Sequence, residues 1–332
     1  MTAIIITIMI VLLLLGFPMM IPLATAAFVG FYMTFGGLGQ METLIQQMMG
    51  GIRPTALIAV PMFILAADIM TRGQSANRLI NMVMSFVGHI KGGLAVSTAA
   101  SCTLFGAVSG STQATVVAVG SPLRPRMLKA GYKDPFTLAR IINSRDIAFL
   151  IPPSIGMIIY GVISGTSIGE LFIAGIGPGL LILAMFSAYC IAYAYINKVP
   201  TEPRSSWKER VVAVKDALWP LGFPVLIVGG IYGGIFSPTE AAAACALYAV
   251  ILESAVFPSL KLHHIYAIAK STGLITAVVF ILVAVGNGFS WIISFAQIPQ
   301  AVLGAVGINE AGPVGVLIAI SIAFFVACMF VD

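Results

Sequence analysis

A long uncharged segment, residues 92–123, constrains this chain most. Its 32 residues carry no charge, and 20 of them are Gly, Ala, Ser or Thr. As one straight helix the segment would extend about 48 Å, whereas the hydrocarbon core of a bilayer is about 30 Å thick. Its middle, Ser109-Gly110-Ser111-Thr112, is polar and contains a glycine that can turn without steric cost. We therefore expect a helical hairpin that turns inside the membrane, where non-helical backbone must line a cavity or be buried in protein.

The composition is that of a polytopic membrane protein. Of the 332 residues, 59% are hydrophobic and only 9% are charged, whereas a soluble domain carries roughly 25% charged residues. The net charge of +5 would suggest nucleic acid in a soluble protein, but Lys and Arg retained in cytoplasmic loops explain it here. We therefore expect an all-α fold that crosses the lipid bilayer several times and binds no nucleic acid. The four cysteines and three histidines lack metal-ligand spacing, which argues against a metalloenzyme.

Charge-free stretches and their breaks predict the order of the spans. Residues 1–41 exceed one span and predict two helices broken near Gly16-Phe17-Pro18. Residues 41–52 and 75–90 predict interfacial helices. The other predicted spans are 55–70, 147–163 with a break at Pro152-Pro153, 171–197, 217–239, 241–256, 271–309 with breaks at Asn287-Gly288 and Pro299, and 311–331.

Three basic segments predict the orientation. Residues 124–145, 198–215 and 261–270 are each separated by two crossings, so one side of the membrane can hold all three. Lys and Arg in short loops favour the cytoplasmic side. We therefore place these segments in the cytoplasm and the N-terminus outside.

The middle of the hairpin has the chemistry of an ion site. The hydroxyls of Ser109, Ser111 and Thr112 are hard oxygen donors, and Gly110 frees backbone carbonyls, so together they could coordinate a dehydrated Na⁺. The half-helix after the turn would direct its positive end towards an anionic substrate group. The alternative is packing of small residues between helices. The excess length of the segment favours the hairpin.

A second break follows at Leu150-Ile-Pro-Pro-Ser-Ile155. Pro152 and Pro153 remove two backbone donors and disfavour helix before them. The chain must unwind there and expose carbonyls beside Ser154. The alternative is a proline kink that holds no ligand.

Three charged residues lie close to predicted spans. Arg145 and Asp146 precede the proline break; they could bind a substrate carboxylate or a cation, but a structural end-cap is the favoured interpretation. Glu240 could be a buried ligand, although a Thr/Glu cap at the start of a helix is slightly favoured.

Two further carboxylates receive different interpretations. Asp332 follows 21 uncharged residues and could lie at a membrane edge. Because an apolar helix that runs straight into a carboxylate has no polar exit loop, we expect the sequence to be truncated. Asp68, near Arg72, predicts an ion pair at a helix end.

Several motifs follow one another along the chain. They are Pro61-Met-Phe-Ile-Leu, Gly92-Gly-Leu-Ala, Phe105-Gly-Ala-Val-Ser-Gly-Ser with Ala114-Thr115, Leu150-Ile-Pro-Pro-Ser-Ile, Ala174-Gly-Ile-Gly-Pro-Gly-Leu and Ser237-Pro-Thr-Glu-Ala. In this order they resemble the large membrane subunit of TRAP transporters, the DctM family of tripartite ATP-independent periplasmic transporters, and the likeness covers the whole chain.

The resemblance implies an elevator-type secondary transporter of the ion-transporter superfamily, with inverted repeats, in the bacterial inner membrane. It implies Na⁺ as coupling ion, no organic cofactor, and organic-acid substrates delivered by a periplasmic binding protein. A small four-helix membrane subunit would be the second partner. The family's first hairpin matches Ser109–Thr112, its unwound sodium-binding segment matches Pro152-Pro153, and an aspartate of its pattern falls on Asp332. On this basis Ser109, Ser111 and Asp332 would hold Na⁺.

Two features depart from the family pattern. The family usually has small or hydroxyl residues where Arg145 and Asp146 stand, and its second hairpin is missing from this sequence.

Four functional segments are expected: scaffold helices with an interfacial arm in 1–91, the first transport-domain half in 92–197, a basic loop with scaffold helices in 198–270, and an incomplete second repeat in 271–332.

Three other functions remain open. A sodium-coupled anion transporter of the same superfamily could work without a binding protein. An intramembrane enzyme would need a base paired with a nucleophilic serine, and residues 92–123 contain no His or Lys. A passive channel would show no requirement for a Na⁺ gradient.

Overall fold

The computed structural model describes residues 2–37, 39–300, 304 and 312–328. All regular secondary structure in these residues is helical, which confirms the predicted all-α fold. Five described helices are long and apolar enough to cross a membrane, and a sixth span results if the bent pair Asp134–Leu150 and Ile155–Ser164 counts as one. The five are Thr55–Arg72, Ile168–Ile196, Trp207–Tyr232, Pro238–Val256 and His264–Phe295.

The chain divides into two compact units. Unit 1 comprises Met1–Pro54 and Ala277–Asp332, and unit 2 comprises Thr55–Thr276. This division rests on contacts between residues. The four segments expected from the sequence were defined by their functions in transport, so they stay a prediction.

Unit 1 is built around aromatic contacts. Phe31 and Ile292 are fully buried, and the rings of Phe35 and Trp291 stack with their planes 4° apart. The predicted break after the first helix is confirmed, because Gly16 adopts a left-handed φ of 80° between α1 and α2. The described helices of this unit are α1 (Thr2–Leu14), α2 (Met20–Phe35), α3 (Met41–Gly50), the later part of α14 (Leu262–Phe295) and α16 (Pro313–Cys328).

The break predicted at Asn287-Gly288 is wrong. α14 continues through both residues, which serve its packing against α3. Asn287 donates its side-chain N–H to the carbonyl of Gln47 at 2.7 Å. A Cβ at position 288 would lie 2.6 Å from Cγ of Met48, so only glycine fits there without a shift. Polar and small residues inside an apolar helix therefore mark a helix contact here and not a turn.

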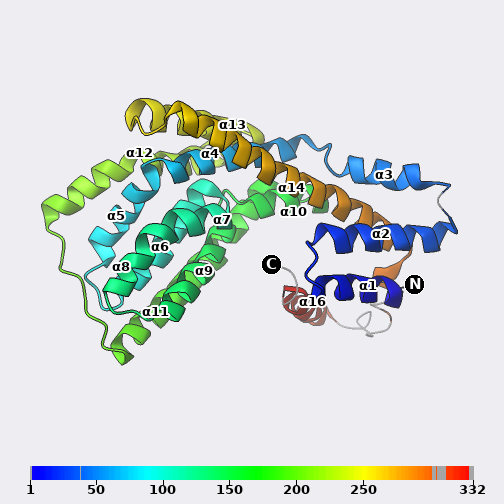
Figure 1. Ribbon diagram of the computed structural model, residues 1–332, viewed down its shortest axis with the longest axis horizontal. Helices are drawn as coiled ribbons and strands as arrows, with labels where there is room; N and C mark the ends of the chain where they lie inside the picture. The colour runs from blue at the N-terminus through cyan, green and yellow to red at the C-terminus, as the bar shows by residue number, and fades with distance from the viewer. Residues whose placement is uncertain (1, 38, 301–303, 305–311, 329–332) are drawn as a thin grey trace. The chain divides into compact units, whose positions relative to one another are not determined.

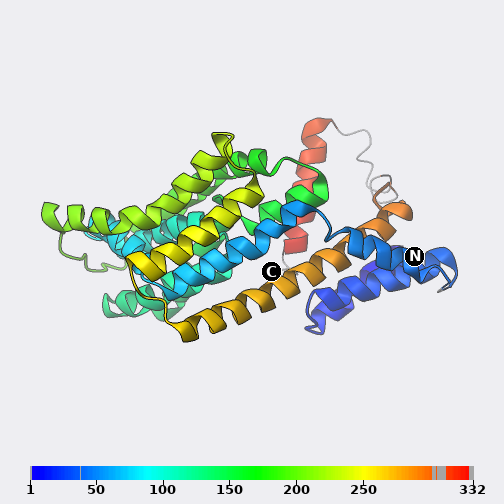
Figure 2. The same cartoon turned by 90° about the horizontal axis from the view of Figure 1, so that it is seen from above.

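Unit 2 holds the remaining helices. α6 packs between α5 on one side and α9 and α11 on the other, α12 lies against α5, and α13 lies against α4 (Figures 1 and 2). The elements are η1 (Thr55–Ile58), α4 (Ala59–Arg72), α5 (Ser75–Val87), α6 (Gly93–Ser109), α7 (Thr112–Thr115), η2 (Val116–Gly120), α8 (Ser121–Lys129), α9 (Asp134–Leu150), α10 (Ile155–Ser164), α11 (Ile168–Ile196), α12 (Trp207–Tyr232), α13 (Pro238–Ile251), η3 (Leu252–Val256) and the first part of α14.

Small and apolar faces hold unit 2 together. A Cβ on Gly106 of α6 would lie 2.3 Å from Cβ of Ala148 on α9, so the two helices approach as closely as glycine allows. The helix predicted at 75–90 is α5, and its apolar residues Leu79, Ile80 and Val83 are buried inside the unit. An interfacial position of α5 stays a prediction.

Loops were expected in the basic segments. Residues 199–206 form one, but most of the remaining basic residues lie on helices. Residues 130–133 are the whole connection between α8 and α9, and residues 262–270 open α14. α12 begins directly after Ser206, because Ser206 and Glu209 form a capping box that satisfies two backbone N–H groups. The basic residues thus lie largely on helix ends.

A buried carboxylate fixes the start of α5. Glu253, on η3, is 0% exposed. It accepts hydrogen bonds from the backbone N–H groups of Gln74 and Ser75, at 3.0 Å each, and from the hydroxyls of Ser75 and Ser259, at 2.5 Å each. These donors satisfy the charge, and they tie α5 to the end of α13 across 178 residues of sequence.

Candidate functional site

Residues 92–123 form a helical hairpin, as predicted, while its turn inside the membrane stays a prediction. α6 ends at Ser109, Gly110 turns the chain with a left-handed φ of 58°, and α7, η2 and α8 return. The arms run antiparallel, because Thr98 on the first arm donates its hydroxyl to Sδ of Met127 on the second at 3.4 Å. The alternative, packing of small residues between helices, is also present, because Gly106 on α6 lies against Ala148 on α9. An ion site at the tip therefore stays a prediction.

The tip of the hairpin gathers oxygen atoms. The hydroxyls of Ser109 and Thr115 lie 3.1 Å apart, and both residues are fully buried. Thr115 donates its hydroxyl to the carbonyl of Ser111 at 2.8 Å, and the Ser111 hydroxyl accepts the N–H of Ala114. Thr112 is the first residue of α7. Thr115 was absent from the predicted site, although its spacing of four residues from Ser111 places both on one helical turn.

The second predicted break lies between α9 and α10, which meet at 45°. Pro152 and Pro153 separate the two helices, and the peptide bond between them is cis. Ser154 is fully buried and caps α10, since its hydroxyl accepts the N–H of Met157 at 3.3 Å. The chain is unwound here as predicted.

The two breaks contact each other directly. The N–H of Ile155 donates to the carbonyl of Gly110 at 3.3 Å. A Cβ on Gly110 would lie 2.6 Å from the carbonyl oxygen of Pro153, so both the left-handed φ and this close approach require glycine. Ser111 and Ser154, each in extended conformation, therefore start two helices at one place.

Arg145 and Asp146 form an ion pair inside α9. Nε of Arg145 lies 3.5 Å from Oδ1 of Asp146, and the helix continues past both residues to Leu150. A structural end-cap at the cytoplasmic interface and a part in binding a substrate or a cation both stay predictions.

Glu240 forms a cap, as favoured from the sequence. Its Oε2 accepts the N–H of Ser237 at 2.7 Å, and the Ser237 hydroxyl accepts the N–H of Glu240. The cap residue is Ser237 and not Thr239, and Glu240 is exposed. Asp332 lies outside the described residues.

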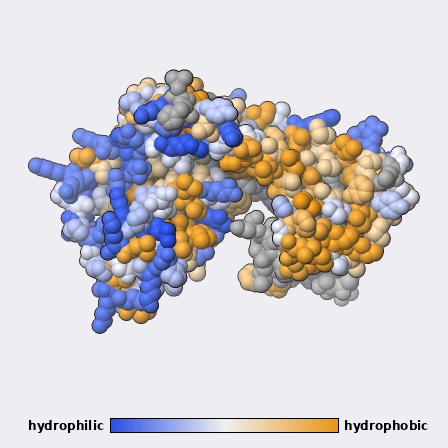
Figure 3. All heavy atoms as spheres, viewed as in Figure 1, coloured by the Kyte–Doolittle hydropathy of each residue, from blue (hydrophilic) through white to orange (hydrophobic). Residues whose placement is uncertain are grey.

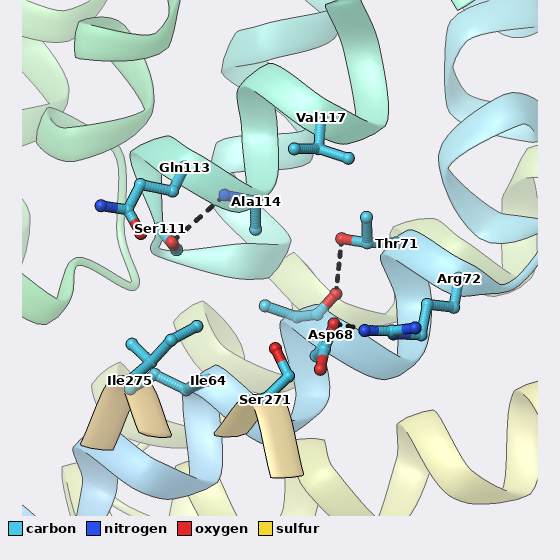
Figure 4. A pocket seen from close by; sticks show the side chains of 11 residues that line it. Ile64, Asp68, Thr71, Arg72, Ser111, Gln113, Ala114, Val117, Ser271 and Ile275 are labelled. Atoms are coloured by element: carbon cyan, nitrogen blue, oxygen red, sulfur yellow. Dashed lines mark hydrogen bonds and ion pairs between the residues drawn. The ribbon is translucent and has the colours of Figure 1, made fainter. Parts of the chain in front are cut away.

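A cavity of about 470 Å³ opens beside the hairpin tip within unit 2 (Figure 4). α4, the return arm of the hairpin and the first part of α14 line it. The lining residues are Ile64, Ala67, Asp68, Thr71, Arg72, Ser111, Gln113, Ala114, Val117, Ser271 and Ile275.

A charged pair lies in the wall of this cavity. Nε of Arg72 donates to Oδ1 of Asp68 at 3.1 Å, which confirms the predicted pair. The Asp68 side chain is 15% exposed, and its second oxygen, Oδ2, has no hydrogen-bond partner among the described residues. Sequence reasoning missed that both residues face the hairpin tip. The available signal was a carboxylate inside an apolar span, a position that is costly unless it serves a site.

The arrangement suits a small polar ligand. The cavity has a volume typical of small-molecule sites. One wall offers a carboxylate and a guanidinium, and the opposite wall offers Ser111 and Gln113. Neutral oxygen atoms of the tip adjoin it, so an ion and a charged solute could bind side by side.

Comparison with known proteins gives one consistent family. Residues 6–332 match the tripartite ATP-independent periplasmic transporter, DctM component. The chain is 83% identical over 332 residues to the ectoine TRAP transporter large permease protein TeaC of Halomonas elongata, covering all of this chain and 78% of that protein.

Two further relatives are similar along most of the chain. It is 74% identical over 324 residues to the ectoine/5-hydroxyectoine TRAP transporter large permease protein UehC of Ruegeria pomeroyi, covering 98% of this chain and 76% of that protein. It is 37% identical over 276 residues to the C4-dicarboxylate TRAP transporter large permease protein DctM of Pseudomonas aeruginosa, covering 83% of this chain and 65% of that protein.

Proposed function

The chain belongs to the DctM family of TRAP transporters, and from this premise we propose that it is the large permease subunit of a sodium-driven importer of ectoine-type solutes. It is a transporter subunit for organic acids in a bacterial membrane and not an enzyme. Membership implies two partners, a small membrane subunit and a periplasmic binding protein. The Na⁺ coupling, the inner-membrane location with cytoplasmic basic segments, and elevator movement of the hairpin belong to the proposal.

One observation carries the proposal: the hairpin tip contacts the proline break next to a cavity that holds a charged pair. The carbonyl of Gly110 and the N–H of Ile155 join the two breaks, and Ser111 lines the cavity. Hydroxyl and carbonyl oxygens at such a broken-helix site are the usual ligands of a coupling ion.

Na⁺ would bind at the tip. Ser109 and Ser111 supply oxygen ligands, and the hydroxyl of Thr115 lies 3.1 Å from that of Ser109 and completes the group. Asp332 would add the formal negative charge, as the family resemblance implies. A bound cation lowers the electrostatic cost of moving a carboxylate across the bilayer, which couples the two fluxes.

The substrate would be a small zwitterion. Ectoine carries a carboxylate and a protonated amidine, and the relatives that are 83% and 74% identical are named for it. In the cavity the guanidinium of Arg72 would bind the carboxylate. Asp68, whose buried Oδ2 has no hydrogen-bond partner among the described residues, would accept the amidine N–H. A dicarboxylate would leave Asp68 facing a like charge.

Uptake by the reconstituted complex tests the ion site. The complex contains the large subunit, the small membrane subunit and the binding protein, in liposomes with a Na⁺ gradient and labelled ectoine. We expect Ser109→Ala and Ser111→Ala each to weaken the apparent Na⁺ affinity about tenfold, the effect of a lost polar contact of about 1.4 kcal/mol.

The matched control is Ser187→Ala on α11. Among the residues that the structure describes, its hydroxyl bonds only the Leu183 carbonyl one turn earlier, so uptake and Na⁺ dependence should stay as in the wild type. Unchanged Na⁺ dependence in both tip variants would refute the ion site. Full uptake without the binding protein would favour the rival transporter that works alone.

A further inference from the structure

A second cavity, of about 620 Å³, lies in a groove between α9 and α11. Neither the hairpin tip nor the charged pair of Asp68 and Arg72 lines it. Its walls are mainly apolar and include Phe136 from α9 and Ile182 and Met185 from α11. It therefore needs an explanation of its own, one that does not depend on the proposed transport site.

The groove contains a buried cation. Arg140 is only 4% exposed, its Nε donates to the carbonyl of Ala95 at 3.4 Å, and its guanidinium carbon lies 4.7 Å from the ring centre of Phe186. Nη2 of Arg140 is buried without a hydrogen-bond partner, and no ion pair among the described residues includes Arg140. A buried guanidinium without an anion is costly, and the described part of the chain supplies no anionic group to this groove.

The mouth of the groove is apolar and exposed. Met185 is 63% exposed and Tyr189 is 59% exposed, although both lie on a helix of 29 residues that is apolar enough to span a bilayer. Only 17% of the 18-residue apolar window of that helix is buried within the described chain. An occupant must therefore offer apolar surface at the mouth and negative charge at Arg140.

The groove lies at the polar end of unit 2. α11 continues from Tyr189 to the basic segment that starts at Lys198, and Figure 3 shows hydrophilic residues gathered where α8 and α11 end and α12 begins. Beside the groove, Phe136 stacks on Tyr193 with ring centres 3.7 Å apart and on Tyr132 at 5.6 Å. Aromatic residues next to Lys and Arg are typical of the headgroup level of a membrane protein.

We propose that this groove binds an anionic phospholipid, with its phosphate on Arg140 and an acyl chain along Ile182 and Met185. A guanidinium suits phosphate because it can donate two parallel hydrogen bonds. Basic pockets between spanning helices on the cytoplasmic side are known lipid sites. A protein partner would have to bring its own buried carboxylate, whereas a phospholipid supplies charge and chain together.

Native mass spectrometry of the large subunit with its small membrane subunit tests the site. The complex is purified from nanodiscs of phosphatidylcholine with or without phosphatidylglycerol. We expect the wild type to retain phosphatidylglycerol and Arg140→Gln to retain about tenfold less, as expected for one lost charge-assisted contact. Arg140→Lys should retain an intermediate amount of phosphatidylglycerol, because lysine keeps the positive charge but cannot form the bidentate contact of a guanidinium.

Two variants keep the test informative if Arg140→Gln does not fold. Arg126→Gln removes the same charge from an exposed position on α8 and should leave lipid retention unchanged. Ala139→Phe fills the groove while it keeps Arg140, and should exclude the lipid.

Three results would overturn the proposal. The first is equal retention of phosphatidylglycerol by the wild type, Arg140→Gln and Ala139→Phe. The second is a thermal shift by inorganic phosphate equal to that by phosphatidylglycerol, which would mean that the acyl chain plays no part. The third is cross-linking of a benzophenone at Met185→Cys to the small membrane subunit and not to lipid.

Discussion

Two carboxylates in apolar helices, Glu253 and Asp68, have opposite surroundings. Glu253 is fully buried and accepts hydrogen bonds from two backbone N–H groups and two hydroxyls. Asp68 lines a cavity and pairs through one oxygen with Arg72, while its other oxygen is buried and has no hydrogen-bond partner among the described residues. The satisfied carboxylate holds helices together, and the half-satisfied one is the carboxylate that we propose binds the substrate.

The largest expected effect is on stability at Glu253. Glu253→Gln would direct its amide NH₂ at the N–H of either Gln74 or Ser75, because these two groups now donate to different oxygens of the carboxylate. We expect a loss of about 3 kcal/mol in unfolding free energy, because buried donors lose a charged acceptor. The melting temperature of the purified complex measures it. A fall in Na⁺-driven uptake by folded protein at an unchanged melting temperature would contradict the structural role.

The next effect separates transport from stability at Asp68. Asp68→Asn keeps the shape and the hydrogen bond from Arg72 but removes the negative charge from the cavity. We expect ectoine uptake to fall at least tenfold, since a hydrogen bond to a charged group contributes about 1.5–3 kcal/mol. The melting temperature should change little. Wild-type uptake with a lowered melting temperature would place Asp68 in the same class as Glu253.

The contrast between these carboxylates was not readable from the sequence. The hairpin was predictable, because 32 uncharged residues exceed one bilayer crossing, and Pro152-Pro153 must unwind a helix. Both conclusions follow from local covalent rules and from the thickness of the membrane.

What escaped prediction depends on contacts that are distant in sequence. Glu253 meets Ser75 across 178 residues, and Asn287 bonds the Gln47 carbonyl across 240 residues. No local sequence pattern predicts either of these contacts. Asn287-Gly288 therefore predicted a break, although the pair is a packing contact inside an intact helix.

The smallest effect is expected at the cap of α13, which tests whether capping alone accounts for the tip serines. Ser237 and Ser111 both accept the N–H of the residue three positions later, but Ser237 lies at an exposed helix start and Ser111 lines the cavity. Ser237→Ala should lower the unfolding free energy by about 1 kcal/mol and leave the Na⁺ dependence of uptake unchanged. If Ser111→Ala matched it in both melting temperature and Na⁺ dependence, the tip would be only a helix cap. A shift in Na⁺ dependence confined to Ser111→Ala would separate the ion site from ordinary capping, because both variants lose the same type of backbone contact.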